Sequence, residues 1–130
     1  MYVKNNQFKK DKGNFQFILK GLILGLMTLF ILVFLFAFVY NIFGFLSYTF
    51  ISKFLLILNF LIIAYVGFYI AQRVKSNGWL NGGIGGMVYM IILILITYFN
   101  HSFSWSMILW LLLLGIITGS IGGILGINFK

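Results

Sequence analysis

The sequence predicts an all-α membrane protein, a four-transmembrane-helix bundle with glycine-rich packing on the cytoplasmic side. Three observations support this fold class. Hydrophobic residues make up 62% and charged residues only 8% of the 130 residues, with a mean hydropathy of +1.11, whereas soluble domains are about half apolar and one quarter charged. The few charges separate long apolar blocks. Glycines gather at the ends of these blocks that the predicted topology puts in one leaflet.

The uncharged stretches set the spans. No Lys, Arg, Asp or Glu lies between Lys20 and Lys53, between Lys53 and Arg73, or between Lys75 and Lys130. A helix needs about 20 mostly apolar residues to cross a hydrocarbon core of about 30 Å, so the last stretch is long enough for two helices. The alternating pattern of a membrane β-barrel is absent. We therefore expect a tail at 1–17 and a transmembrane domain at 18–130, with helical spans near 18–40, 54–71, 80–99 and 105–127.

The tail before the first span is basic and aromatic, with four lysines together with Tyr2, Phe8, Phe15 and Phe17. Each lysine near an anionic bilayer contributes about 1 kcal/mol of attraction. The tail therefore either rests on anionic lipid or is a disordered segment that only sets topology, and the sequence leaves both open. The first apolar run is longer than a signal-peptide core and no small-x-small cleavage site follows it, so we expect this span to be retained.

Three short polar segments separate the spans. Residues 41–53 end the first apolar run, and their aromatic part, 43–50, is expected to lie at the membrane interface. The Asn77–Gly78 pair predicts a helix end closed by glycine and followed by a tight turn. Residues 100–104 form the third break. All three connections are short, so consecutive spans are expected to be neighbours.

The basic residues orient the bundle. Only Lys53 falls outside if the N-terminus is inside, and the other eight then lie in the cytoplasm: Lys4, Lys9, Lys10, Lys12, Lys20, Arg73, Lys75 and Lys130. Such an excess marks the cytoplasmic side. We predict a multi-pass membrane protein with both termini cytoplasmic. The basic residues that give the net charge of +8 lie between apolar blocks and not along one face. The expected partner is therefore the bilayer, with anionic lipids at its cytoplasmic face, and not nucleic acid.

Small residues open the first and third spans and close the second and fourth. The candidate packing residues are Gly21, Gly25, Gly67, Ala71, Gly82, Gly86, Gly115, Gly119, Gly122 and Gly126. The last four follow i, i+4, i+7 and i+11, which places them on one helix face. Because small-xxx-small faces let membrane helices approach closely, we predict a tight cytoplasmic half and bulkier, splayed outer halves. The glycine face is expected to pack against itself, a second copy or a partner.

The two halves of the chain resemble each other weakly. Gly21-xxx-Gly25 corresponds to Gly82-xxx-Gly86, and Ala64-xx-Gly67-xxx-Ala71 corresponds to Gly119-xx-Gly122-xxx-Gly126. Both halves then run in the same direction through the membrane. A parallel duplication about an axis along the membrane normal would give this pattern. Chance similarity between glycine-containing spans would give it as well.

The sequence predicts no enzyme and no cofactor. It has no cysteine, Asp11 is its single acid and His101 its single histidine, so neither a carboxylate pair nor a metal-ligand cluster is available. The Gly82–Gly86 run is not preceded by a strand or followed by Lys-Ser/Thr, which argues against a phosphate-binding loop.

Two weaker site hypotheses involve polar residues. If Asn81 caps the third span, the positive end of that helix beside Arg73 and Lys75 could bind a phosphate headgroup of an anionic lipid. Asn59 is the single amide at membrane depth, and we expect it to hydrogen-bond another helix or, as the second interpretation, to mark a pore or substrate site. Apart from Lys20 at the start of the first span, no charged residue lies inside a predicted span, which argues against a proton-coupled transporter.

Two segments resemble a known family. Residues 67–86 read GFYIAQRVKSNGWLNGGIGG, and the chain ends GIITGSIGGILGINFK. They are similar to the YrzE-like putative membrane proteins of Firmicutes, a small uncharacterised four-span family, over roughly 21–130. The resemblance implies a Gram-positive plasma membrane and a four-helix fold, but no activity. Ala71 and Gln72 depart from the glycine that members tend to have near the end of the second span.

Three functions follow in order of support. The first is a non-enzymatic accessory or assembly component, alone, as a homo-oligomer or with a membrane-protein partner. The second is a small oligomeric channel or transporter in which Asn59, Thr97 and the glycine face line a polar path. The third is an enzyme acting on lipid, for which the sequence offers no nucleophile, base or metal site.

Overall fold

The computed structural model describes the backbone of residues 2–43, 48–74, 77–98 and 104–129 and the side chains from residue 15 onward, except for 43–48, 75–76, 99–103 and 130. Throughout these ranges the regular structure is helical, with no strand. The helices are α1 (Tyr2–Phe43), α2 (Tyr48–Arg73), α3 (Gly78–Tyr98) and α4 (Trp105–Asn128).

Each helix contains a segment long and apolar enough to cross a membrane. These segments are Phe15–Ile42, Thr49–Arg73, Gly78–Tyr98 and Trp105–Asn128. The predicted all-α, four-helix membrane class is therefore confirmed, and the chain is a multi-pass membrane protein.

Two helices begin earlier than the hydropathy pattern predicts. α1 begins at Tyr2, so the tail continues the first helix and the disordered alternative is wrong. α2 begins at Tyr48 and not at 54, so Lys53 lies inside the helix. A helix pairs its own backbone groups near the membrane surface, and a lysine there extends its amine to water, so polar residues need not end the helix. Of the predicted interfacial loop, only 44–47 remains between helices, outside the described residues.

The turn between α2 and α3 also differs from expectation. Asn77, and not Gly78, has the left-handed conformation, with φ of 50°, which asparagine tolerates better than most residues. The Asn77 carbonyl oxygen accepts hydrogen bonds from the backbone N–H groups of Leu80 (3.1 Å) and Asn81 (3.0 Å). α3 therefore begins at Gly78. The prediction that Asn81 caps this helix is wrong, because Asn81 lies in its first turn.

α4 begins at a side-chain cap that belongs to the predicted third break. Ser104 precedes the helix in an extended conformation, and its hydroxyl accepts a hydrogen bond from the backbone N–H of Met107 at 3.4 Å. Such a cap satisfies one of the unpaired donors of the first turn. The preceding residues of the break, including Asn100 and His101, lie outside the described part of the chain.

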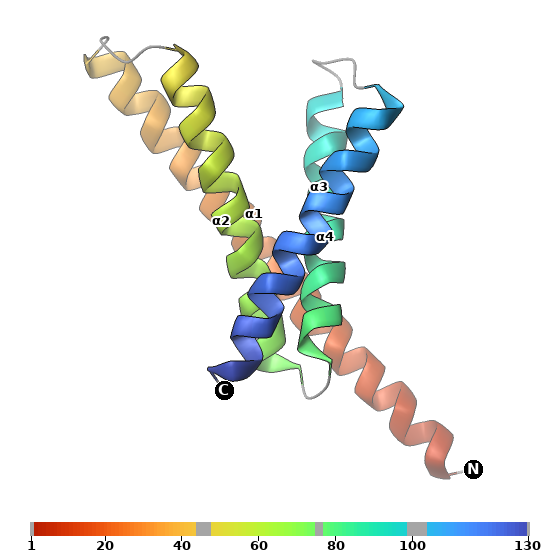
Figure 1. Cartoon of the computed structure of the whole chain (residues 1–130). Helices are drawn as coiled ribbons and strands as arrows, with labels where there is room; N and C mark the ends of the chain where they lie inside the picture. Colours follow the sequence, from red (N-terminus) through yellow and green to blue (C-terminus); the bar gives the residue numbers. More distant parts are fainter. Residues whose placement is uncertain (1, 44–47, 75–76, 99–103, 130) are drawn as a thin grey trace.

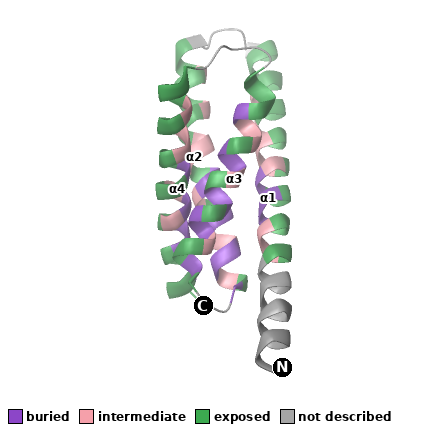
Figure 2. Cartoon of the chain, turned by 90° about the vertical axis from the view of Figure 1, so that its right-hand side faces the viewer, coloured by how far each residue is buried: buried purple, intermediate pink, exposed green. Residues whose placement is uncertain are grey.

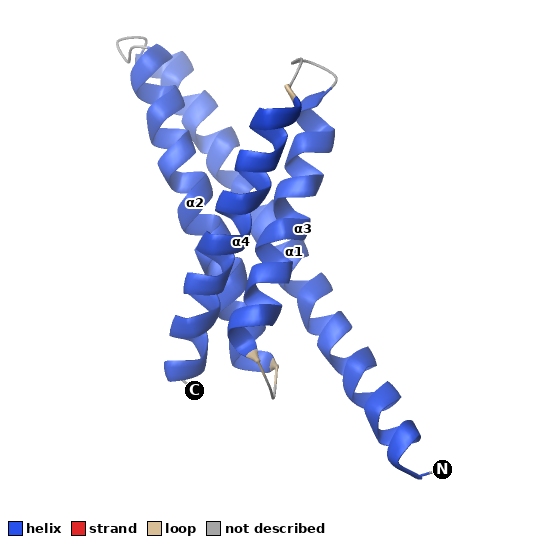
Figure 3. Cartoon of the chain, turned by 45° about the vertical axis from the view of Figure 1, so that its right-hand side comes forward, coloured by secondary structure: helices blue, strands red, loops and turns tan. Residues whose placement is uncertain are grey.

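The helices form two antiparallel pairs that meet at one end and diverge at the other (Figure 1). The pairs are α1–α2 and α3–α4, and the same arrangement is visible in the turned view (Figure 3). We call the end that holds the α2–α3 turn the closed end and the opposite end the splayed end. In the described residues α1 contacts α2 and α3 but not α4, whereas α4 contacts both α2 and α3. The start of α1 extends beyond the closed end (Figure 1).

The buried residues gather in the half of the bundle toward the closed end (Figure 2). Their hydrophobic cluster consists of Leu22, Ile62, Ile63, Val66, Ile70, Val74, Tyr89 and Met90. Toward the splayed end large apolar side chains are exposed on all four helices, as Phe30 (71%) and Trp105 (84%) illustrate. Such exposure suits a lipid environment, where the solvent is as apolar as the side chains.

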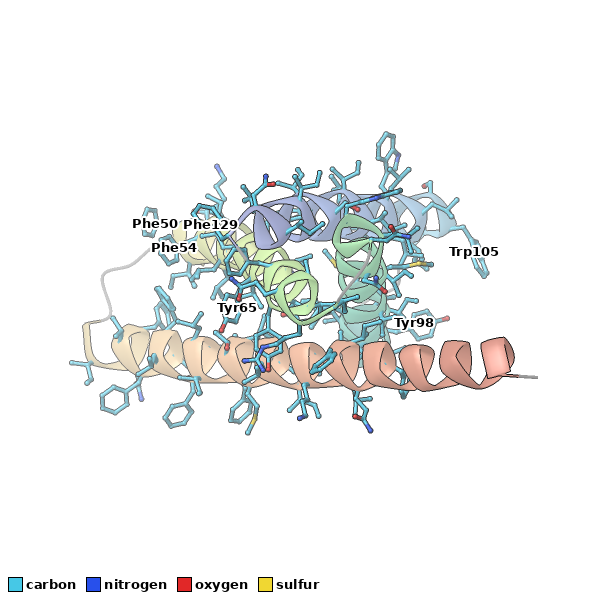
Figure 4. All side chains as sticks on the ribbon, turned by 90° about the horizontal axis from the view of Figure 1, so that it is seen from below. Phe50, Phe54, Tyr65, Tyr98, Trp105 and Phe129 are labelled. Atoms are coloured by element: carbon cyan, nitrogen blue, oxygen red, sulfur yellow. The ribbon has the colours of Figure 1, made fainter. Side chains whose placement is uncertain are left out.

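Each pair stays together as the two pairs diverge. The rings of Phe36 in α1 and Phe54 in α2 lie 5.0 Å apart between centroids. Viewed from below, Phe50 and Phe54 of α2 lie on one side of the molecule and Tyr98 and Trp105 on the other (Figure 4). The separation is therefore between the pairs and not within them.

Cysteine cross-linking tests this shape. We expect Phe68→Cys with Phe129→Cys, whose native rings lie 6.2 Å apart at the closed end, to be joined rapidly by a short bifunctional thiol reagent. Phe50→Cys with Tyr98→Cys, at the splayed end, should remain unjoined. The native chain has no cysteine, so the background is clean. Equal yields from the two pairs, measured by gel mobility in native membranes, would contradict the splayed arrangement.

Candidate functional site

The feature that organises the bundle is a helix crossing lined with glycine. α4 presents five buried glycines, Gly115, Gly119, Gly122, Gly123 and Gly126. They face α2 on one side and α3 on the other. We call these residues and the α2 and α3 positions that meet them the glycine crossing.

α2 and α4 touch through their backbones. A Cβ atom added at Gly67 would meet the carbonyl oxygen of Gly119, and one added at Gly122 would meet the carbonyl oxygen of Ala64. At Gly126 an added Cβ would lie 2.9 Å from the Cβ of Ala71. No side chain fits at these points, and the close approach permits Cα–H···O contacts between the helices.

α3 and α4 approach equally closely. A Cβ added at Gly82 would lie 2.6 Å from the Gly119 carbonyl oxygen and 2.9 Å from the Gly123 Cα. One added at Gly86 would meet the Gly115 carbonyl oxygen and lie 3.0 Å from the Gly119 Cα. Gly119 therefore faces Gly67 of α2 as well as two glycines of α3, and it is the point where three helices meet.

The glycines of α1 make a looser contact, because they meet side chains and not backbone. A Cβ added at Gly21 would lie 2.7 Å from Cγ1 of Ile70, and one added at Gly25 would meet the side chains of Val66 and, at 3.3 Å, Tyr89. Side chains can change rotamer where backbone cannot move. α1 therefore packs through side chains at these glycines, whereas α2, α3 and α4 meet through backbone.

This geometry decides what the glycine face contacts within the chain. The α4 glycines meet α2 and α3 of the same chain, so this face has no free surface for a second copy. A partner or a second copy would have to bind elsewhere. Sequence reasoning did not single out Gly78 for packing, although its added Cβ would lie 2.9 Å from the Ala71 Cβ.

The contacts between α2 and α4 are reciprocal in the way that an internal duplication requires. If Ala64 corresponds to Gly119 and Gly67 to Gly122, the contact of Gly67 with Gly119 and that of Gly122 with Ala64 exchange under the correspondence. A two-fold relation produces such reciprocity. The relation does not extend to the outer helices, because α3 contacts α2 whereas α1 does not contact α4 in the described residues.

Four polar side chains within the spans, Thr28, Asn59, Tyr89 and Thr97, make hydrogen bonds. The Tyr89 hydroxyl of α3 donates to Oδ1 of Asn59 in α2 at 3.2 Å, the kind of interhelical bond expected for Asn59. The hydroxyls of Thr28 and Thr97 donate to the carbonyl oxygens of Leu24 (2.8 Å) and Leu93 (2.7 Å) in their own helices. Sequence reasoning missed Tyr89, although its place at i+7 from Gly82 puts it on the glycine face of α3.

The residues of the predicted headgroup site are described only in part. The Arg73 guanidinium carbon lies 5.1 Å from the centre of the Tyr69 ring, one turn earlier in α2. The Asn81 side-chain amide donates to the Asn77 carbonyl oxygen at 3.0 Å. Lys75 lies outside the described residues. Arg73 is exposed at the end of α2, and the contact of these residues with anionic lipid stays a prediction.

The part of the chain whose side chains are described contains no group of three or more His, Cys, Asp or Glu residues that could hold a metal ion. Asp11 and His101 both lie outside that part.

Comparison with known proteins places the chain in a family. A family model described as "Protein of unknown function (DUF3792)" matches residues 14–126. The chain belongs to this family. The match to DUF3792 begins just before the first membrane segment and ends at the last glycine of the crossing, so it covers all four spans. Membership in a small uncharacterised family is confirmed. Neither the curated proteins nor the solved structures contain a match.

Single methyl additions test the glycine crossing. Gly122→Ala should destabilise the bundle by about 1–3 kcal/mol, the range for overpacking, because its Cβ would meet the Ala64 backbone. Gly21→Ala is the matched control. It should cost less, since its Cβ would meet the Ile70 side chain. Unfolding by denaturing detergent in mixed micelles measures both, and equal losses would show that the backbone contact has no special weight.

Proposed function

We propose that the chain is a non-enzymatic accessory or assembly component of a bacterial plasma membrane. In this proposal it is a YrzE-like protein of Firmicutes with both termini cytoplasmic and the closed end facing the cytoplasm. The observation that carries the proposal is the glycine crossing, which joins three helices by backbone contact. A rigid closed end with separated helix pairs above it suits a protein that holds a partner.

The polar groups support this role over a channel. A conducting path needs hydrogen-bonding groups that face the permeating species. Thr28 and Thr97 direct their hydroxyls to their own backbones, and the glycine face is occupied by α2 and α3. The predicted polar path consisted of Asn59, Thr97 and the glycine face. Thr97 bonds its own helix and the glycine face packs against α2 and α3, so neither faces a path for solutes. The small channel or transporter remains the second candidate, and Asn59 is the one residue that favours it.

The charge distribution supports anionic lipid as a second partner. Eight of the nine basic residues flank the closed end or precede it in sequence, and the positive-inside rule puts this end in the cytoplasm. Arg73 is exposed there at the end of α2. The cytoplasmic leaflet carries anionic lipids that attract such residues.

Removing two of these charges tests the lipid contact. Arg73→Gln with Lys75→Gln should reduce the number of anionic lipids that stay bound in native mass spectrometry, because about 1 kcal/mol of attraction is lost for each charge. Lys53→Gln, which removes a charge at the opposite end, is the control and should leave the number unchanged. Unaltered lipid binding in the double variant would rule out this contact.

Purification tests the accessory role. The chain, extracted from its native membrane in a gentle detergent, should carry another membrane protein at a fixed ratio. Leu at Gly119 and Gly122 should abolish this association, because it forces α4 away from α2 and α3. In liposomes the purified chain should conduct neither ions nor small solutes. A solitary chain that conducts them, with flux abolished by Asn59→Leu, would establish the channel instead.

A further inference from the structure

The hydrogen bond between Asn59 and Tyr89 leaves donors unused. The two side chains offer three hydrogens, one hydroxyl and two amide, and the bond of 3.2 Å uses one. Tyr89 is fully buried and Asn59 is half-buried. Among the described side chains no buried nitrogen or oxygen lacks a partner, and the amide nitrogen of Asn59 has no partner there. The unused amide hydrogens of Asn59 therefore reach the surface of the chain.

These hydrogens lie near the middle of the membrane. Asn59 is ten residues into the segment Thr49–Arg73, and Tyr89 is eleven residues into Gly78–Tyr98. At about 1.5 Å per residue, both lie about 15 Å along their helices from opposite membrane surfaces. Since the hydrocarbon core is about 30 Å thick, the two helices agree on a depth close to its centre.

Few acceptors exist at this depth. Lipid ester and phosphate oxygens lie at the interfaces, about 15 Å away. Water is scarce in the core, and no carbonyl oxygen of the described helices accepts a hydrogen bond from this amide. An amide left unpaired in hydrocarbon is strongly disfavoured. A protein side chain from outside the chain is the acceptor best able to reach these hydrogens.

The surroundings of Asn59 indicate where such a side chain would approach. Asn59 continues the buried face of α2 that holds Ile62 and Ile63. The pairs α1–α2 and α3–α4 diverge toward the splayed end (Figure 1). One turn closer to the splayed end Leu56 is 59% exposed, and two turns beyond Tyr89 on α3 Ile96 is 60% exposed. Apolar surfaces on α2 and α3 thus continue from the amide toward the splayed end.

We propose that a transmembrane helix of a partner protein packs between the diverging pairs and accepts a hydrogen bond from the Asn59 amide at mid-membrane depth. This inference rests on the proposed accessory role and names its docking surface. The partner helix is apolar and carries an amide or hydroxyl side chain near its middle. The exposed apolar side chains provide area, and the Asn59 amide sets the depth and selects the partner.

A defined peptide tests the proposal. The chain, labelled with a fluorophore at Phe50→Cys, is reconstituted in phosphatidylglycerol and phosphatidylethanolamine vesicles. The probes are two transmembrane peptides of leucine and alanine that bear an acceptor dye, one with Asn at the centre and one with Leu. They are used at a dilution at which each alone is monomeric. We expect the Asn peptide to bind about three- to tenfold more tightly, the range for one interhelical hydrogen bond.

Four variants separate the amide from its neighbours. Asn59→Leu should abolish the preference for the Asn peptide, and Asn59→Gln should keep most of it. Tyr89→Phe removes the internal bond but leaves the amide hydrogens, so the preference should remain. Thr97→Val should also keep it, because that hydroxyl donates to its own backbone. Thermal unfolding in the same vesicles identifies any variant that fails to fold, and the Gln and Phe variants then carry the test.

Several results would overturn the proposal. Equal binding of the two peptides, or a preference that survives Asn59→Leu, would remove the role of the amide. Energy transfer between differently labelled copies that Asn59→Leu abolishes would assign the acceptor to a second copy. Solute flux that requires Asn59 would assign it to water in a pore.

The failure of this inference and that of the accessory role are distinguishable. A copurifying protein whose ratio is unchanged in Asn59→Leu would overturn the docking surface and keep the accessory role. Absence of any copurifying protein, with an intact peptide preference, would overturn the accessory role and keep the binding property of Asn59.

Discussion

The contact on which the bundle depends is the approach of three backbones at Gly119. Membrane helices gain little from the hydrophobic effect when they associate, because lipid tails are as apolar as the side chains they replace. The association therefore depends on dispersion and weak Cα–H···O contacts, which require atoms to come very close. Glycines on α2, α3 and α4 allow that approach at one level of the membrane. The positions of the buried apolar side chains follow from it.

The splayed end follows from the same crossing. Straight helices that touch at one level with inclined axes must separate as they continue. The rings of Phe36 and Phe54 hold α1 against α2 there without closing the space between the pairs. The buried glycines of α2, α3 and α4 thus lie toward the closed end, where the helices approach closely, and the Phe36–Phe54 pair lies toward the splayed end, where the pairs separate. The distribution of small and bulky residues along the spans therefore corresponds to the change in separation between the helix pairs.

Much of the fold could be predicted from the sequence because single-residue properties decide it. The charged residues between apolar blocks indicate the number of spans, and the spacing of the α4 glycines indicates that they share one face of that helix. Helix starts could not be predicted in this way. Lys53 and Thr49 lower the hydropathy, but the helix continues through them because backbone pairing near the membrane surface outweighs side-chain polarity. The start of α3 depends on the φ angle of Asn77, which composition does not reveal.

The partners of the site residues were less predictable than the residues themselves. The sequence indicates that Asn59 needs a hydrogen bond in the membrane, but several spans offer a hydroxyl. Only the crossing brings Tyr89 to it. In the same way, the spacing of the α4 glycines does not specify whether a neighbouring chain or α2 and α3 fill that face. These are long-range relations that depend on the tilt of the helices. Local pattern does not encode tilt.

The order of the helices along the chain has a consequence for biosynthesis. α4 supplies the residue at which three helices meet, yet it is the last of the four to leave the ribosome. Until it enters the bilayer, α2 and α3 lack the helix that fills the groove between them, and α1 has only side-chain contacts to hold it. The glycine crossing can therefore be completed only after the fourth span has been synthesised.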